Sequence, residues 1–149
     1  MKAGEFCNRE VVVVERDASV AEAAVLMREH HVGSVVVVDA LGGAARPVGV
    51  LTDRDIVIEF IARDVSPQDV EAGDAVGAAL VTVTEDTGLY ETIELMREHG
   101  VRRVPVVDAD GILVGLFASD DALQLLTEQL QHLVRLVAKQ QRQESKRRA

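Results

Sequence analysis

Thr52 and Asp55 stand three residues apart at a point where an apolar strand is predicted to turn into a helix. Residues 49–51 are typical of the strand, and the apolar residues from Ile56 on recur at helical spacing. A helix N-terminus presents free backbone N–H groups and a partial positive charge, so it can bind phosphate. A hydroxyl and a carboxylate at this place could hold a phosphate and the hydroxyls of a ribose, respectively.

The same spacing also has a purely structural interpretation. Thr-x-x-Asp is close to a capping box, in which the two side chains bond only the backbone of their own helix. Arg54, which lies between them, can be a phosphate contact or a solvent-exposed side chain. Taken alone, the pattern leaves a ligand site and a helix cap both open.

The surroundings of this pair occur twice in the chain. Residues 27–39 match residues 96–108 at an offset of 69. Beyond the repeated aspartate the offset falls to 66, which aligns Asp55 with Asp121. The difference lies in a longer turn at residues 40–46 of the first copy, and surface turns tolerate insertions. One structural unit is therefore used twice.

Apolar patterning predicts that each copy runs strand, helix, strand, strand, helix. Residues 32–38 form a nearly continuous apolar run, which is typical of a strand buried on both faces. The helix that begins at Ser19 carries alanines and a methionine on the face expected to pack on the sheet. The expected strands are 11–14, 32–38, 46–51, 81–84 and 104–107, and the expected helices are 19–31, 52–63, a short piece at 76–80, and 89–99.

Because repeat, element order and motif agree, the chain resembles a tandem pair of cystathionine-β-synthase (CBS) domains, or Bateman module. The resemblance covers nearly all of residues 3–127. It implies an α/β fold of the α+β type, in which two β-α-β-β-α repeats pack pseudo-symmetrically through their sheets. It also implies clefts between the repeats that bind an adenosine nucleotide (AMP, ADP or ATP) as a regulatory ligand, with no required cofactor.

The first copy matches the nucleotide-binding pattern of the family, and the second departs from it. In the family the aspartate, here Asp55, contacts the ribose hydroxyls, and the Thr or Ser, here Thr52, contacts a phosphate. In the second copy Asp121 keeps its place, but Ala118 replaces the hydroxyl residue and Ser119 comes one place late. Phosphate binding through this motif is therefore expected mainly of the first copy.

Basic residues before the second buried strand offer another phosphate contact. Arg102 and Arg103 take the places of Gly33 and Ser34, and in the family basic residues there can reach phosphates. Two solvated arginines at a helix-to-strand turn are the alternative. The resemblance implies no catalytic and no metal-binding residues, and the implied nucleotide contacts are Thr52, Asp55, Arg54, Gly33, Ser34, Val12, Asp121, Arg102, Arg103 and Pro105.

Composition argues against several classes of function. The net charge is −9 and aromatic residues make up 3%, which makes nucleic acid an unlikely main partner. No apolar run approaches the roughly 20 residues that span a bilayer, so no membrane insertion is expected. The single Cys7 cannot form an internal disulfide, which fits a cytoplasmic location. No catalytic triad, Cys–His pair, metal constellation or Walker loop is evident, so no enzymatic activity is expected.

The C-terminal stretch has a heptad pattern over about two heptads. It predicts a long helix that packs its apolar stripe on the body or on a second subunit, and a homodimer is expected. The residues from Lys139 on hold five basic side chains and one acidic one, so this tail carries +4 and the remainder −13. The tail is expected to fray. The stripe residues, spaced 3, 4, 3 and 4 apart, are Leu123, Leu126, Leu130, Leu133 and Val137.

The sequence thus divides into a first repeat (1–65), a linker with the second repeat (66–127) and a helical extension with a basic tail (128–149). The favoured function is a nucleotide sensor that acts in trans on a separate effector protein, because ligand binding alters repeat packing or dimer geometry. The alternative is an unliganded scaffold that dimerises or binds partners through the leucine seam. The sequence identifies neither the ligand nor the partner.

Overall fold

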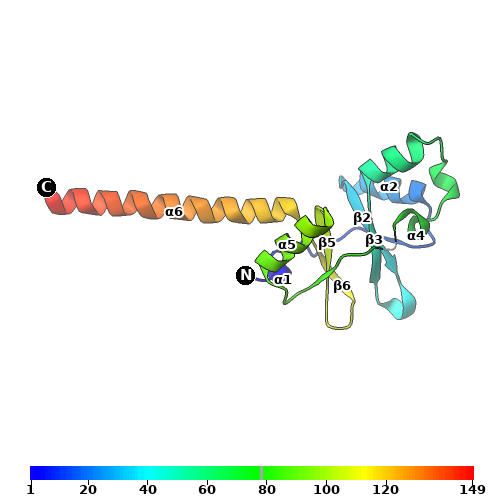
Figure 1. Cartoon of the computed structure of the whole chain (residues 1–149), viewed down its shortest axis with the longest axis horizontal. Coiled ribbons are helices and arrows are strands. Elements are labelled where there is room, and N and C mark those ends of the chain that lie inside the picture. The colour runs from blue at the N-terminus through cyan, green and yellow to red at the C-terminus, as the bar shows by residue number, and fades with distance from the viewer. Residues whose placement is uncertain (78) are drawn as a thin grey trace.

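The computed structural model describes residues 1–77 and 79–149. Two three-stranded sheets carry the fold, one in each repeat (Figure 1). In each sheet the first strand pairs parallel with the second, and the third pairs antiparallel with the second. The predicted α/β fold of two β-α-β-β-α repeats is confirmed. The strands are β1 (Val13–Glu15), β2 (Ser34–Asp39), β3 (Arg46–Thr52), β4 (Val83–Thr84), β5 (Arg103–Val107) and β6 (Leu113–Ala118).

The helices cover the sheets and join the two repeats. The Ser19 hydroxyl accepts a hydrogen bond from the Glu22 N–H at 3.1 Å, and the Glu22 carboxylate accepts one from the Ser19 N–H at 2.7 Å. These two bonds form a capping box at the start of the helix that the sequence predicts from Ser19. The helices are α1 (Ala3–Phe6), α2 (Val20–His30), α3 (Asp53–Ile56), which continues as a π-helix over Val57–Ile61, α4 (Ala72–Ala75), α5 (Leu89–His99) and α6 (Ser119–Arg148), with 3₁₀ turns at Leu41–Gly43 and Pro67–Asp69.

Each repeat has its own hydrophobic core beneath the central strand of its sheet. Val35, Val36 and Val37 of β2 are fully buried, so this strand is covered on both faces, as its apolar run predicts. In the second repeat Phe117 of β6 is the largest fully buried side chain. The strands β3 and β5 lie against each other, so the repeats meet through their sheets.

The N-terminal segment of each repeat packs on the other repeat. Ala3 of α1 is fully buried in the core of the second repeat, and Figure 1 shows α1 close to α5. Ala72 of α4 is fully buried in the core of the first repeat. Asn8 and Leu116 exchange two backbone hydrogen bonds of 2.9 Å, which extend the sheet of the second repeat. This exchange ties the two halves into one unit.

Several predicted boundaries are wrong. The strand expected from residue 11 begins at Val13, and the strand expected from residue 81 begins at Val83, and the residues just before them line clefts. The short helix expected at 76–80 is also misplaced. The helical turn comes earlier, in α4, and Val76 is extended with φ −91° and ψ 134°. Ala78 of that prediction lies outside the described residues.

The helix α6 leaves the body as one continuous helix of 30 residues (Figure 1). The predicted long C-terminal helix is confirmed, whereas the predicted fraying after Lys139 is wrong, since the helix runs to Arg148. Its buried side chains, Ala122 and Leu125, lie near its start. The division of the chain at residues 65 and 127 stays a prediction.

Two candidate ligand clefts between the repeats

A first cleft of about 190 Å³ lies where β2 begins. Most of its lining comes from the first repeat, but Arg103 and Leu116 come from the second. The cleft is therefore formed between the repeats. Its lining residues are Asn8, Glu10, Val11, Val12, Val32, Gly33, Ser34, Arg103 and Leu116.

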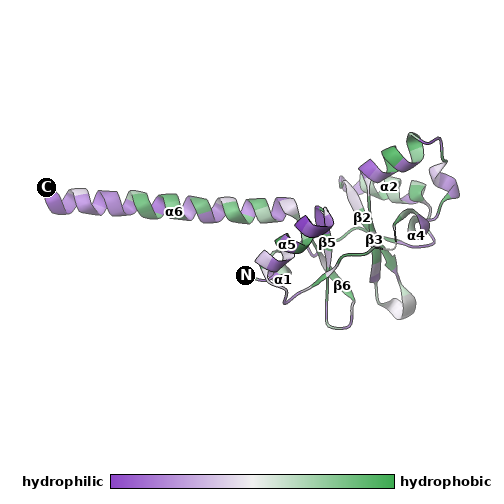
Figure 2. Ribbon diagram, in the orientation of Figure 1, coloured by the Kyte–Doolittle hydropathy of each residue, from purple (hydrophilic) through white to green (hydrophobic). Residues whose placement is uncertain are grey.

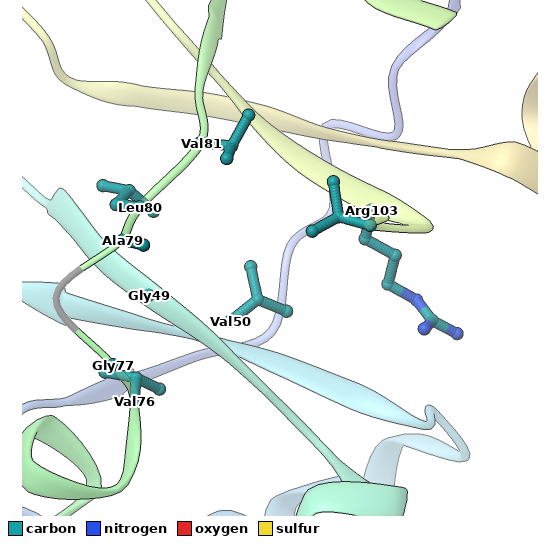
Figure 3. Close-up of a pocket in the computed structure, with 9 residues that line it drawn as sticks. Gly49, Val50, Val76, Gly77, Ala79, Leu80, Val81 and Arg103 are labelled. Atoms are coloured by element: carbon teal, nitrogen blue, oxygen red, sulfur yellow. The ribbon is translucent and has the colours of Figure 1, made fainter. Parts of the chain in front are cut away.

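A second cleft of about 130 Å³ lies at the equivalent place in the other half. Here Gly49 and Val50 of β3 supply the wall from the first repeat, and the other residues belong to the second (Figure 3). Offsets of 69 and 66 relate the two linings: Val12 corresponds to Val81, and Leu116 to Val50. The second lining comprises Gly49, Val50, Val76, Gly77, Ala79, Leu80, Val81, Val101 and Arg103.

Arg103 lines both clefts. Its position in the repeat is that of Ser34, so it has no basic counterpart in the first copy. In Figure 3 its guanidinium points away from Gly77, Ala79 and Leu80, which line the other side of the second cleft. The side chain is half-buried, and no acidic group of residues 1–77 and 79–149 forms an ion pair with it. A guanidinium in this state can bind a phosphate through two parallel hydrogen bonds.

Thr52 and Asp55 form a capping box at the start of α3. The Thr52 hydroxyl accepts a hydrogen bond from the Asp55 N–H at 3.1 Å, and the Asp55 carboxylate accepts one from the Thr52 N–H at 3.0 Å. Thr52 is also the partner of Ser34 across β2 and β3, so it lies beside the first cleft. The Thr52 O–H is donated to no acceptor among the described residues, which leaves it free for a ligand.

The equivalent motif of the second repeat is incomplete. The Asp121 carboxylate accepts a hydrogen bond from the Ala118 N–H at 2.8 Å. Ala118 has no hydroxyl that could accept the second bond of the box, from the Asp121 N–H. Asp121 instead lines a separate hollow with Phe6, near the start of α6. Ala118 is the partner of Arg103 across β5 and β6, as Thr52 is of Ser34. At these paired strand positions the second repeat thus has an arginine and an alanine where the first has two hydroxyl side chains.

The structure gathers part of the predicted site and separates the rest. Val12, Gly33, Ser34 and Arg103 line the first cleft together. The other predicted residues, apart from the capping pair described above, lie outside the described lining of both clefts. Arg54 is exposed, Arg102 lies 3.8 Å from Asp120 in an exposed ion pair, Asp121 faces Phe6, and Pro105 is fully buried in β5.

Several cleft residues escaped the sequence prediction. Val81 could have been found, because the offset of 69 carries Val12 onto it. Asn8, Glu10 and Leu116 had no such signal, because their place in the first cleft depends on how the N-terminal segment crosses to the second repeat.

The glycines of the repeated motif make room for these crossing segments. A Cβ atom on Gly49 would lie 2.5 Å from the Cβ of Val76, and one on Gly115 would collide with the sulfur of Cys7. Burial raises the pKa of the Cys7 thiol, which keeps it protonated at neutral pH. Cys7 therefore serves as a packing residue against the core of the second repeat.

The helices of residues 1–77 and 79–149 include none with both the length and the apolar character that crossing a membrane requires. Within the same residues, no three His, Cys, Asp or Glu side chains lie close enough together to hold a metal ion.

Comparison with known sequences gives a consistent family match. A sequence profile described as the CBS domain matches residues 3–62 and again residues 72–128. The chain is 36% identical to an uncharacterized protein of Methanopyrus kandleri over 84% of this chain and 62% of that protein, so it spans less than two thirds of that relative. It is 34% identical to hypoxic response protein 1 of Mycobacterium tuberculosis over 85% of each chain.

Solved structures give the same match. The crystal structure of Hypoxic Response Protein I with two coordinated zinc ions has a TM-score of 0.73 and 32% identity, and the match covers 83% of this chain and 98% of that one. A CBS domain protein from Pyrobaculum aerophilum complexed with AMP has a TM-score of 0.74 and 27% identity, over 85% and 99%. A hexameric CBS-CP12 protein from bloom-forming cyanobacteria has a TM-score of 0.71 and 26% identity, over 83% and 69%.

Proposed function

Because this chain belongs to the CBS-domain family and carries two copies of the domain in tandem, we propose that it is a regulatory module that binds an adenosine nucleotide between its repeats. AMP, ADP and ATP are the candidate ligands, and a relative of the same fold has been crystallised with AMP. The observation that carries the proposal is Arg103, a half-buried cation that lines both clefts and has no ion-pair partner among the described residues.

In this proposal the phosphate binds Arg103, and the Thr52 hydroxyl beside the first cleft adds a second donor. Val12 and Val32 give the first cleft an apolar wall for the adenine. Asp55 is assigned to the ribose hydroxyls, since one of its carboxylate oxygens is not used by the helix cap. Because one guanidinium serves two clefts, each chain binds one nucleotide phosphate tightly.

The size of the clefts links binding to a change of shape. Volumes of 190 and 130 Å³ are below the roughly 300 Å³ at which small-molecule pockets begin. A whole nucleotide therefore needs the repeats to move apart, or protrudes from the cleft. Since each cleft has walls from both repeats, the ligand favours whichever arrangement of the repeats gives it more contact. That preference is the regulatory signal we propose.

The remaining parts of the proposal concern partners and setting. We propose that the module is not an enzyme, is cytoplasmic, forms a homodimer and acts in trans on an effector protein. The hexameric state of one relative supports self-association as a property of this fold. Among the described lining residues of the two clefts, Glu10 is the one acidic side chain, which supports a binding role rather than a catalytic one.

A second function rests on a different observation. The exposed apolar side chains of α6 favour an unliganded interaction scaffold, in which the clefts are vestigial and the helix carries the function. The two functions predict opposite results in a nucleotide titration.

The test is calorimetric titration of the nucleotide-free protein with AMP, ADP, ATP and adenosine. Arg103→Gln removes the charge but keeps a long polar side chain. We expect AMP affinity to fall about 10- to 100-fold in this variant, the range of one charge-assisted hydrogen bond. Affinity for adenosine, which lacks the phosphate, should stay unchanged.

Arg102→Gln is the matched control, because it removes the same charge one residue earlier from an exposed side chain outside both clefts. Equal losses in the two variants would mean that only the general charge matters, and would reject Arg103 as the phosphate ligand. Absence of binding by every nucleotide would favour the scaffold.

A further inference from the structure

An apolar stripe runs along α6 with no part of the body covering it. Its side chains are between 47% and 68% exposed, which is unusual for leucine and valine in a folded protein. Figure 2 shows green and purple bands alternating along the first part of the helix and a purple far end. The stripe, which we call the α6 stripe, consists of Leu123, Leu126, Leu130, Leu133, Val134 and Val137.

The body holds α6 by another face. Phe6 of α1 packs with Leu125, and Asp121 and Glu128 line the same hollow. At 100° per residue these positions lie on the side of the helix away from Leu123 and Leu130. The α6 stripe therefore stays open even where the helix touches the body, and a second helix can run along it without displacing any packed side chain.

Charge is unevenly distributed along the chain. The tail from Lys139 on carries +4, and the rest of the chain carries −13. Asp120 and Asp121 lie in the first turn of α6, whereas Lys146, Arg147 and Arg148 lie in its last turn. The helix is thus acidic where it leaves an acidic body and basic at its free end.

We propose that the α6 stripe binds the α6 stripe of a second copy of this chain, with the two helices antiparallel. A parallel pair would place two +4 tails side by side and two acidic bodies side by side. An antiparallel pair instead lays each basic tail along the acidic first turn and body of its partner. The stripe spans only about two heptads, which is short for a coiled coil on its own, so this attraction decides the orientation.

The stripe also sets the register. If Leu130 lies opposite its own copy, Leu123 comes opposite Val137 and Leu126 opposite Val134, whereas Leu133 comes opposite Thr127. In this register the basic tail of each helix, from Lys139 on, comes level with the acidic first turn of the other helix. The dimer requires no ligand, so it can exist whether or not the clefts bind a nucleotide.

Sedimentation equilibrium of the full chain tests the surface. Leu130→Gln combined with Leu133→Gln should weaken self-association at least 100-fold, because each change acts in both copies. Leu136→Gln is the matched control: it is 61% exposed, close to the 58% of Leu133, but lies off the stripe. A monomeric parent chain, or equal weakening by the control, overturns the proposal. Association should also weaken as salt rises from 0.05 to about 0.5 M.

Disulfide trapping tests the orientation. In a Cys7→Ala background, Leu123→Cys and Val137→Cys are made as separate proteins of different mass and mixed under mild oxidation. The antiparallel register predicts the mixed disulfide between the two proteins as the main product. Predominance of the two homodisulfides would show parallel helices, and the absence of any disulfide from a dimeric mixture would show that another surface dimerises; either result overturns the proposal.

Discussion

The two clefts are built from equivalent residues, yet they differ at the positions that can meet a ligand. The first has Asn8, Glu10 and Ser34, with the Thr52 hydroxyl beside it. The second has glycine or alanine at the places of Asn8 and Glu10, and alanine at that of Thr52. Arg103 replaces Ser34 and lines both. Duplication thus produced two similar cavities, and divergence left them one shared cation.

In the proposed function this loss of symmetry has a consequence. Two clefts that each had a cation could bind two phosphates with equal strength. With one guanidinium between two clefts, a phosphate bound to Arg103 in one cleft leaves the other cleft without a cation.

The largest expected effect is on the stability of the fold, at the contacts where the N-terminal segment of each repeat packs on the other repeat. Gly49→Ala would place a methyl group against the branched Cβ of Val76 and should destabilise the fold by about 2 kcal/mol. Gly115→Ala should cost less, because the Cys7 sulfur can rotate away. Thermal denaturation should show a shift of about 4–8 °C for Gly49→Ala. Gly77→Ala, whose methyl meets no described atom within 4 Å, is the control, and an equal loss there would contradict the crossing account.

How far the sequence predicts this molecule depends on the range of the interactions involved. The buried strand β2 and the capping boxes were predictable, because apolar runs and Thr-x-x-Asp spacing are local signals. The packing of α1 and α4 on the opposite repeats could not be predicted, because it is a long-range contact. Its only trace in the sequence is a glycine at residues 49 and 115, where the crossing segments approach the strands. For the same reason Glu10 and Leu116 were missed as cleft residues.

The second expected effect concerns the helix caps. Thr52→Ala removes the hydroxyl that accepts the Asp55 N–H and should cost about 1 kcal/mol in urea unfolding. Ala118→Thr gives the second repeat the missing hydroxyl and should stabilise it by up to the same amount. The comparison fails if Ala118→Thr destabilises the chain as much as Thr52→Ala does.

A third pair of variants identifies the cleft in which the phosphate binds. Glu10→Ala removes a negative charge from the first cleft and should tighten AMP binding about 3- to 10-fold, because the like charge is lost. Ala79→Glu adds the same charge to the second cleft. Calorimetry should show the larger change for Glu10→Ala, with Glu29→Ala, an exposed residue on α2, as the control. A larger change for Ala79→Glu would move the phosphate to the second cleft.

The smallest expected effect is on pH dependence. A hydrogen bond of 2.8 Å from Lys2 lowers the pKa of Asp86. In the other repeat, Asp17 takes the position of Asp86, but Glu71 takes the position of Lys2, so the equivalent ion pair cannot form. The Lys2–Asp86 contribution to stability is present at neutral pH and is lost as pH falls below about 4 toward the lowered pKa. Asp86→Asn should slightly flatten the acid limb of the stability curve. An acid limb that Asp86→Asn leaves unchanged would contradict the assignment.

The measurement that tests the central claim most directly is the stoichiometry of AMP binding to the nucleotide-free chain. A calorimetric titration at a protein concentration well above Kd gives the number of AMP molecules per chain. A single guanidinium shared by two clefts predicts one tightly bound AMP per chain. Two AMP molecules bound with equal affinity would show that the clefts act independently of Arg103, and the absence of binding would contradict a nucleotide-sensing role.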